Sequence, residues 1–170
     1  AKLLAHHKSG DKIRGVDRGL KAGDIVKVGK TVELECLDTP GHTMCHICLR
    51  SHTDTPALFS GDTLFNAGAG NCRNGGDPEA LYHTCSALLK RLKSDTRLYP
   101  GHDYLTNNLA FGLSVEPGNA ETSRWQARAA QENGATAPIL TLAQERGVNA
   151  FFRLAEPGLI AGLRQRVPGL

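Results

Sequence analysis

Several features that define common protein classes are missing from this 170-residue chain. Only 5% of its residues are aromatic, and its lysines and arginines are scattered without a run of like charge. A site for single-stranded nucleic acid needs exposed rings beside basic residues. No apolar stretch approaches the roughly 20 residues that cross a bilayer. We therefore expect no nucleic-acid partner and no membrane partner, and the net charge of +3 leaves a weak preference for anionic small molecules.

Disulfide patterns and secretion signals are also missing. Five cysteines, an odd number, do not indicate a disulfide framework in a chain of this length. No charged and then apolar leader opens the sequence, so we expect a reducing, cytoplasmic setting. The chain starts at Ala1 without a methionine and is typical of a segment entered midway through a domain.

Short alternating segments bounded by glycine or proline predict strands in the first 100 residues. The predicted strands cover residues 22–29, 31–37, 45–49, 57–60 and 96–99. In the second of these, Val32, Leu34 and Cys36 should face the core, while Glu33 and Glu35 should face solvent. This alternation predicts a strand that is buried on one side only.

The clearest helix begins after Asp77, a favourable N-cap residue followed by Pro78 at the first helical position. Apolar side chains then recur at helical spacing and predict one buried face. They are Leu81, Tyr82, Cys85, Leu88, Leu89 and Leu92. Further helices are expected over residues 104–115, 120–133, 140–147 and 158–166. The order of elements predicts an α/β (α+β layered) fold followed by a small helical part.

Three polar side chains share one architectural position. His42, Asp62 and His102 each follow a predicted strand and lie in or beside a glycine-containing turn. Loops at strand ends often carry binding or catalytic residues, because the scaffold fixes the backbone while the side chain stays accessible. Imidazole and carboxylate suit zinc or iron, and one carboxylate can bridge two metals. Such turns are common, so spacing alone leaves open both a metal site and ordinary polar turns.

The motifs around these residues resemble a known family. Three of them resemble consecutive metal motifs of the metallo-β-lactamase superfamily: Thr-Pro-Gly-His-Thr (39–43), Phe-Ser-Gly-Asp-Thr-Leu-Phe (59–65) and Pro-Gly-His-Asp-Tyr (100–104). The match is closest to hydroxyacylglutathione hydrolases (glyoxalase II). Four later motifs resemble that family's C-terminal region in the same order, at residues 107–109, 115–119, 141–145 and 149–153. The resemblance covers about residues 10–155.

This resemblance implies a fold and an activity. Residues 1–103 would form a partial metallo-β-lactamase domain, the C-terminal half of an αββα sandwich, and residues 104–170 a helical substrate-binding region. The implied activity is metal-dependent hydrolysis of glutathione-type thioesters. Its implied cofactor is zinc at two sites, although the same ligands also serve iron and manganese.

The resemblance also implies roles for single residues. His42 resembles a histidine ligand of the first metal, Asp62 the bridging carboxylate at the centre of catalysis, and His102 a histidine ligand of the second metal. Positions that hold glutathione in the family are matched by Tyr104, Asn108 and Arg153. An arginine suits the glycyl carboxylate of glutathione because its fork donates two parallel hydrogen bonds.

Two departures from the family pattern limit these implications. The His-x-His-x-Asp-His motif, which supplies the other metal ligands, is absent from the chain, and His6-His7 is not that motif. Asn71 and Arg73 stand where the family has a basic and an aromatic residue that contact glutathione, so a different thiol substrate stays open. We expect a truncated, impaired enzyme that alone hydrolyses little or no thioester. A missing N-terminal segment or a homo-oligomer would complete it.

Other interpretations also stay open. One is a mononuclear-iron persulfide dioxygenase of the same superfamily, although the Asn-Asn-Leu and Asn-x-Phe-x-Arg motifs favour the hydrolase. Another is a non-catalytic half-fold that binds a partner through an exposed sheet edge and an uncovered core face. Residues 45–48 have CxxC spacing without the context of a redox motif. We therefore interpret Cys48 as buried packing and His46 as a hydrogen-bonded neighbour.

Overall fold

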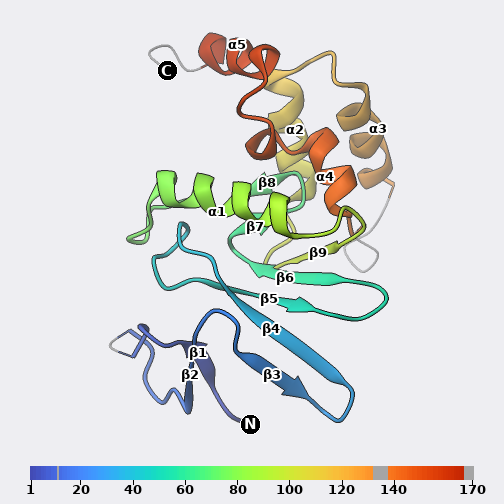
Figure 1. Cartoon of the computed structure of the whole chain (residues 1–170). Coiled ribbons are helices and arrows are strands. Elements are labelled where there is room, and N and C mark those ends of the chain that lie inside the picture. The colour runs from blue at the N-terminus through green and yellow to red at the C-terminus, as the bar shows by residue number, and fades with distance from the viewer. Residues whose placement is uncertain (11, 132–137, 167–170) are drawn as a thin grey trace.

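A five-stranded sheet forms the centre of the computed structural model, which describes residues 1–10, 12–131 and 138–166 (Figure 1). Its strands lie in the order β3 (Ile25–Val28), β4 (Val32–Asp38), β5 (Ile47–Ser51), β6 (Ala57–Gly61) and β9 (Arg97–Pro100). The first four pair antiparallel in series, whereas β9 lies parallel to β6. Consequently β4, β6 and β9 all run in the same direction and end at the same edge of the sheet.

Two small strand pairs flank this sheet. A parallel pair joins β1 (Leu4–His6) to β2 (Arg18–Leu20), and an antiparallel pair joins β7 (Leu64–Phe65) to β8 (Gly68–Ala69). Buried Leu20 of β2 packs with Leu34 and Cys36 of β4 in one apolar cluster. The N-terminal pair therefore covers part of one sheet face.

Helix α1 (Pro78–Arg91) covers the other face of the sheet (Figure 1). The predicted N-cap is confirmed, since the Asp77 carboxylate accepts a hydrogen bond from the Ala80 amide at 2.7 Å. Leu81 and Leu88 of the predicted face are buried against the sheet. Tyr82 was wrongly predicted to be buried and is 47% exposed. One step along a helix turns a side chain by about 100°, which takes Tyr82 off the stripe that contacts the sheet.

Strand β4 is buried on both faces, which corrects the prediction of a half-buried strand. Glu35 is only 8% exposed, and Leu37 lies in the core beneath α1. Because β4 lies between β3 and β5 and is covered from both sides, the polar and apolar alternation does not mark a solvent face. Val32, expected in the core, is 38% exposed because it lies at the hairpin end of the strand, paired with exposed Val28.

The C-terminal part is helical, as predicted. It contains α2 (Leu105–Val115), α3 (Ala120–Ala129), α4 (Leu142–Val148), a 3₁₀ turn η2 (Ala150–Phe152) and α5 (Pro157–Arg166). The last two residues of the helix expected over 120–133 lie outside the described residues. Trp125, Leu109 and Leu140 share the core of this part. In the described part of the chain, no helix is long and apolar enough to cross a membrane.

The helical part is hydrogen-bonded to the sheet. The Leu98 amide of β9 donates to the Leu140 carbonyl at 2.9 Å, and the Leu142 amide donates to the Thr96 carbonyl at 2.9 Å. The Leu142 side chain is fully buried in the core between the sheet and α1. The segment before α4 thus extends the sheet beyond β9.

A candidate metal centre at three strand ends

The ends of three strands bring His42, Asp62 and His102 to one edge of the sheet. Asp62 follows β6 directly, and His102 follows β9 after a single glycine. The parallel pairing continues past the strands, because the Gly101 amide donates to the Gly61 carbonyl at 2.8 Å. The turn after β4 carries His42 to the same edge. Backbone pairing therefore sets the separation of the loops that carry the three side chains.

The Asp62 carboxylate lies between the two imidazoles. Its Oδ1 is 2.7 Å from His102 Nδ1, and its Oδ2 is 3.6 Å from His42 Nε2. The side chains are partly open to solvent, with 28% exposure for Asp62 and 52% for His102. The three predicted residues thus converge on one point, while their roles as metal ligands stay a prediction.

His42 has the orientation of a metal-binding histidine. Its Nδ1 is 2.6 Å from the Asn71 carbonyl oxygen, and a carbonyl only accepts, so Nδ1 carries the proton. Nε2 is the ring nitrogen that faces Asp62, 3.6 Å from its Oδ2. A backbone carbonyl that fixes the tautomer in this way is the usual support for a metal-ligating histidine.

Imidazole and carboxylate groups suit a metal ion, but here the side chains contact one another directly. Among the described residues, no group of three or more His, Cys, Asp or Glu side chains is arranged to hold a metal. The direct contact between Asp62 Oδ1 and His102 Nδ1 occupies one potential metal-binding atom of each residue. A metal at this point would have to replace that contact.

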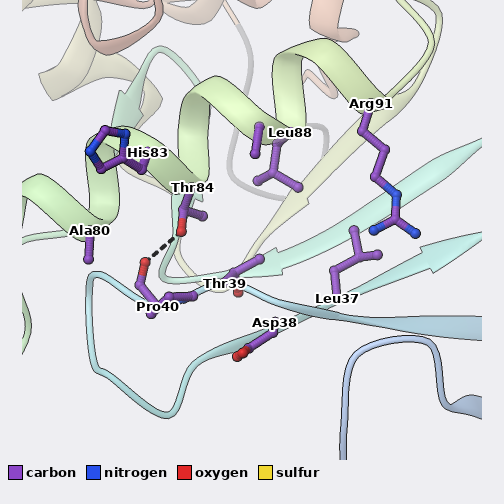
Figure 2. Close-up of a pocket in the computed structure, with 10 residues that line it drawn as sticks. Leu37, Asp38, Thr39, Pro40, Ala80, His83, Thr84, Leu88 and Arg91 are labelled. Carbon is purple, nitrogen blue, oxygen red and sulfur yellow. Dashed lines mark hydrogen bonds between the residues drawn. The ribbon is translucent and has the colours of Figure 1, made fainter.

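Helix α1 supports the turn that carries His42. Thr84 Oγ1 donates to the Pro40 carbonyl at 2.7 Å, the contact drawn in Figure 2. The Asp77 amide, just before the helix, donates to the Gly41 carbonyl at 2.8 Å. A cavity of about 420 Å³ lies beside this contact, between α1 and the end of β4. Its lining includes none of the three converging residues, so this cavity is separate from the candidate metal centre.

His46 lies behind Asp62 and fixes its backbone. The Asp62 amide donates to His46 Nε2 at 3.2 Å, so the other ring nitrogen carries the proton and donates to Thr63 Oγ1 at 2.8 Å. Burial, together with the nearby His42, lowers the pKa of His46 to about 4, against the opposing effect of Asp62. His46 is therefore neutral at physiological pH. The structure agrees with its interpretation as a hydrogen-bonded neighbour and adds that the Asp62 backbone is one of its partners.

Two glycines allow the loops to approach Asp62. A Cβ at Gly70 would lie 1.8 Å from the Asp62 carbonyl oxygen, and one at Gly101 would lie 2.7 Å from Asp62 Oδ1. Both distances are far below van der Waals contact. The backbone of the loop after β8 therefore packs directly against the aspartate.

Aromatic side chains form one wall beside His102. The Tyr104 ring stacks on the His102 ring with 5.4 Å between centroids and 10° between planes. Phe65 meets both rings edge-on, at 5.1 Å from Tyr104 and 6.0 Å from His102. Phe65 was not among the predicted site residues, although it ends the same motif as Asp62.

The other predicted substrate residues lie at different places. Asn71 holds His42 through its carbonyl, and its side-chain oxygen accepts from the Arg73 amide at 3.0 Å. Asn108 donates to the Asn66 carbonyl at 2.9 Å, beside the β7–β8 hairpin. Among the described residues, the exposed guanidinium of Arg73 has no hydrogen-bonding or ionic partner. Their roles in substrate binding stay predictions.

Arg153 is fully engaged within the helical part. Its Nη1 and Nη2 pair with the Glu116 carboxylate at 2.8 and 2.9 Å, and its Nε donates to Glu156 at 3.0 Å. The Gly147 carbonyl accepts a further bond at 3.3 Å. To bind a substrate carboxylate, as predicted, Arg153 would have to exchange one of these partners.

A buried carboxylate at the end of the 141–145 motif, which was not among the predicted site residues, secures the loop next to the candidate centre. Glu145 of α4 is fully buried, and its two oxygens accept from the Ala67 amide at 3.2 and 2.9 Å. Asn149 donates to Glu145 at 2.9 Å and to the Gly68 carbonyl at 3.1 Å. Burial raises the pKa of Glu145 to about 8, although the bonds from Asn149 and Ala67 oppose this. The network ties α4 to the β7–β8 hairpin, which leads into Asn71.

Comparisons with known proteins agree with this architecture. A sequence model described as "Hydroxyacylglutathione hydrolase C-terminus" matches residues 103–167. The chain is 61% identical over 170 residues to a hydroxyacylglutathione hydrolase of Polaromonas sp. strain JS666, with 100% of this chain and 65% of that protein covered. A hydroxyacylglutathione hydrolase of Nitrosococcus oceani is 56% identical over 169 residues, with 99% and 64% covered. The chain thus spans just under two thirds of these relatives.

A solved structure has the same fold. The metallo-β-lactamase from Staphylococcus aureus subsp. aureus COL superposes with a TM-score of 0.62, covering 100% of this chain and 45% of that one. The two sequences are 18% identical, so this likeness concerns the fold alone. It confirms the predicted metallo-β-lactamase architecture.

Proposed function

We propose that this chain belongs to the hydroxyacylglutathione hydrolase family and is a metal-dependent hydrolase of glutathione-type thioesters. The observation that carries the proposal is the Asp62 carboxylate between His42 and His102. The 61% identity to a protein named for this activity supports it.

His42, Asp62 and His102 would hold the metal, which we propose to be zinc at two sites. A bound metal of this kind lowers the pKa of water and polarises a carbonyl. The chain contributes the orientation of the donors. The Asn71 carbonyl fixes the His42 tautomer, and His46 fixes the backbone of Asp62, the residue to which we assign the central catalytic role. A thiolate is a good leaving group, so the mechanism does not require a general acid.

Substrate binding is assigned to the wall beside His102 and to the helical region. We place the glutathione thioester against Tyr104, with Asn71, Arg73 and Asn108 around it, and assign residues 104–170 to substrate binding. Arg73 offers a carboxylate an exposed guanidinium, whereas Arg153 already holds Glu116 and Glu156. Of the two arginines, Arg73 can therefore bind a substrate without first losing an ion pair.

The five cysteines support a reducing, cytoplasmic location for this activity. All five are free thiols in the structure, and Cys36, Cys48 and Cys85 are buried. Burial raises the pKa of Cys48 to about 11, against the effect of hydrogen bonds from Thr39 and Thr63. A thiol of this kind is an inert packing residue, as predicted for Cys48, and not a redox group.

The test uses a fusion of this chain to the part of the Polaromonas relative that it does not cover. Hydrolysis of a lactoyl-glutathione thioester and the metal content after dialysis are both measured. We expect Asp62→Asn to lower kcat/KM by about 10²-fold or more and to reduce bound metal, because a metal ligand is lost. Asp95→Asn, in an exposed turn, is the matched control. A fusion that retains full activity with Asp62→Asn would contradict the proposal.

A further inference from the structure

A small polar cavity lies at the opposite end of the sheet from His42, Asp62 and His102. It forms where β5 ends, β9 begins and α1 ends, and its volume is about 190 Å³. A water molecule occupies about 30 Å³ in the liquid, so this space is large enough for a small polyatomic ion. Its lining includes Arg50, His52, Arg91, Lys93 and Thr96.

The charges around this cavity do not balance. Arg50, Arg91 and Lys93 are basic, and the acid bound to the two arginines is buried Glu35, which accepts from Arg50 at 2.9 Å and also pairs with Arg91. Lys93 has no ionic partner among the described residues. Three cations thus face one carboxylate, which leaves a surplus of two positive charges before His52 is counted. The cavity is therefore a favourable place for an anion.

Glu35 also contacts His52, the histidine in the cavity lining. His52 Nε2 is 2.9 Å from Glu35 Oε2, and the two arginines occupy both oxygens of the same carboxylate. The acidic residues of the neighbouring turns, Asp54 and Asp95, are exposed and do not line the cavity. Both carboxylates are open to solvent, which screens their charges more than that of buried Glu35.

One donor of Arg50, a residue that lines the cavity, has no acceptor in the part of the chain that the structure describes. Arg50 Nε is buried and has no hydrogen-bond partner among the described residues. A buried N–H without an acceptor is costly, and buried polar groups in folded proteins are nearly always paired. The oxygens of a phosphate group in the cavity would accept hydrogen bonds from the guanidinium groups of the arginines in its lining, which can pair with phosphate through two parallel bonds.

From the cavity, the charge surplus and the unpaired Arg50 donor, we propose that this cavity binds a small tetrahedral oxyanion, namely a phosphate group. The ligand is either free phosphate or the terminal phosphate of a small phosphomonoester. The site is independent of the proposed thioester hydrolysis, because the cavity and the candidate metal centre lie at opposite ends of β6 and β9.

The test is isothermal titration of the 170-residue chain with inorganic phosphate after metal has been removed with a chelator. Chelation matters because a metal at Asp62 would itself bind phosphate. We expect saturable binding, and we expect Lys93→Gln to weaken it by about tenfold, the loss of one charge-assisted contact. Lys90→Gln is the matched control, since Lys90 is an exposed lysine in the last turn of α1, three residues before Lys93, and does not line the cavity.

A further variant and further ligands test the same proposal. Glu35→Gln removes the competing carboxylate, so it should tighten phosphate binding, whereas a merely structural ion-pair cluster would show no such gain. Equal affinity for inorganic phosphate and glycerol phosphate would support recognition of a terminal phosphate, and preference for inorganic phosphate would support the free ion. Absence of saturable binding, equal losses in Lys90→Gln and Lys93→Gln, or stronger binding of acetate than of phosphate would each overturn the proposal.

Discussion

Glu145 is a single residue with a clear pH signature. Its carboxyl group is fully buried beside Ala67 and Asn149, and in the part of the chain that the structure describes its hydrogen-bond partners include no cation. Burial raises its pKa from an ordinary value of 4.5 to about 8. The folded state therefore holds this proton over a pH range in which the unfolded state releases it.

The sign of the resulting pH dependence follows from proton linkage. Below about pH 4.5 both states are protonated and the contribution of Glu145 to stability is complete. As pH rises from about 4.5 to 8 the unfolded state ionises first, so the free energy of unfolding falls. Glu145→Gln should remove this fall. Urea unfolding at pH 5 and pH 8, followed through Trp125 fluorescence, measures it. Equal pH slopes in the variant and the unchanged chain would count against the argument.

His46 gives a second prediction at the residue scale. Replacing it with asparagine removes the acceptor for the partly buried Asp62 amide. We expect a loss of about 1–3 kcal/mol in the free energy of unfolding, the usual cost of leaving a buried group unpaired. Metal retained after dialysis should fall as well, because the Asp62 backbone loses its support.

His83→Asn is the matched control for that substitution. The His83 side chain lies on α1 and is 69% exposed. Among the described residues its one ionic partner is the exposed Glu79 carboxylate, at 3.8 Å. Exposed substitutions of this kind usually change stability by less than about 0.5 kcal/mol. If both histidine variants lose the same stability, His46 does not have the supporting role that its contacts indicate.

At the scale of elements, α1 links the core to the candidate metal centre. Thr84 is buried on this helix, and its hydroxyl donates to the Pro40 carbonyl, two residues before His42 (Figure 2). Thr84→Val keeps the shape of the side chain but leaves that carbonyl without its donor. We expect a loss of about 1 kcal/mol in thermal or urea unfolding and weaker metal retention. Thr53→Val, in an exposed loop, should change neither quantity.

Helix α1 was predicted well because its signals are local. The Asp77 cap, Pro78 and the helical spacing of Leu81 and Leu88 lie within a few turns of one another. The side chains of Tyr82 and Glu35 were placed wrongly for the opposite reason. Their burial depends on what covers the helix or the strand, which is decided by residues far away in the sequence.

In the candidate metal centre, too, some features could be predicted from the sequence and others could not. His42, Asp62 and His102 could be found because each follows a strand in a recognisable motif. The Asn71 carbonyl, which orients His42, carries no sequence signal, since every residue has a carbonyl. The parallel pairing of β1 with β2 also joins distant residues. Contacts of these two kinds require the fold before they can be seen.

For the whole molecule, the open question is whether residues 1–103 and 104–170 fold separately. The proposed boundary lies between β9 and α2, where the chain passes from sheet to helices. The contacts cross this boundary, however. Leu98 and Leu142 bond to backbone groups of the other part, and Glu145 reaches across to Ala67. Leu142 even lies in the core beneath α1.

These contacts predict a single cooperative unfolding transition. Trp125, the only tryptophan, reports on the helical part, whereas the thiols of Cys48 and Cys85 are buried in the core between the sheet and α1. In a urea titration, the change in Trp125 fluorescence and the exposure of these thiols to a thiol reagent should share one midpoint, as two-state unfolding requires. A fluorescence midpoint at clearly lower urea would show that the helical part unfolds on its own, and that the boundary after residue 103 separates two folding units.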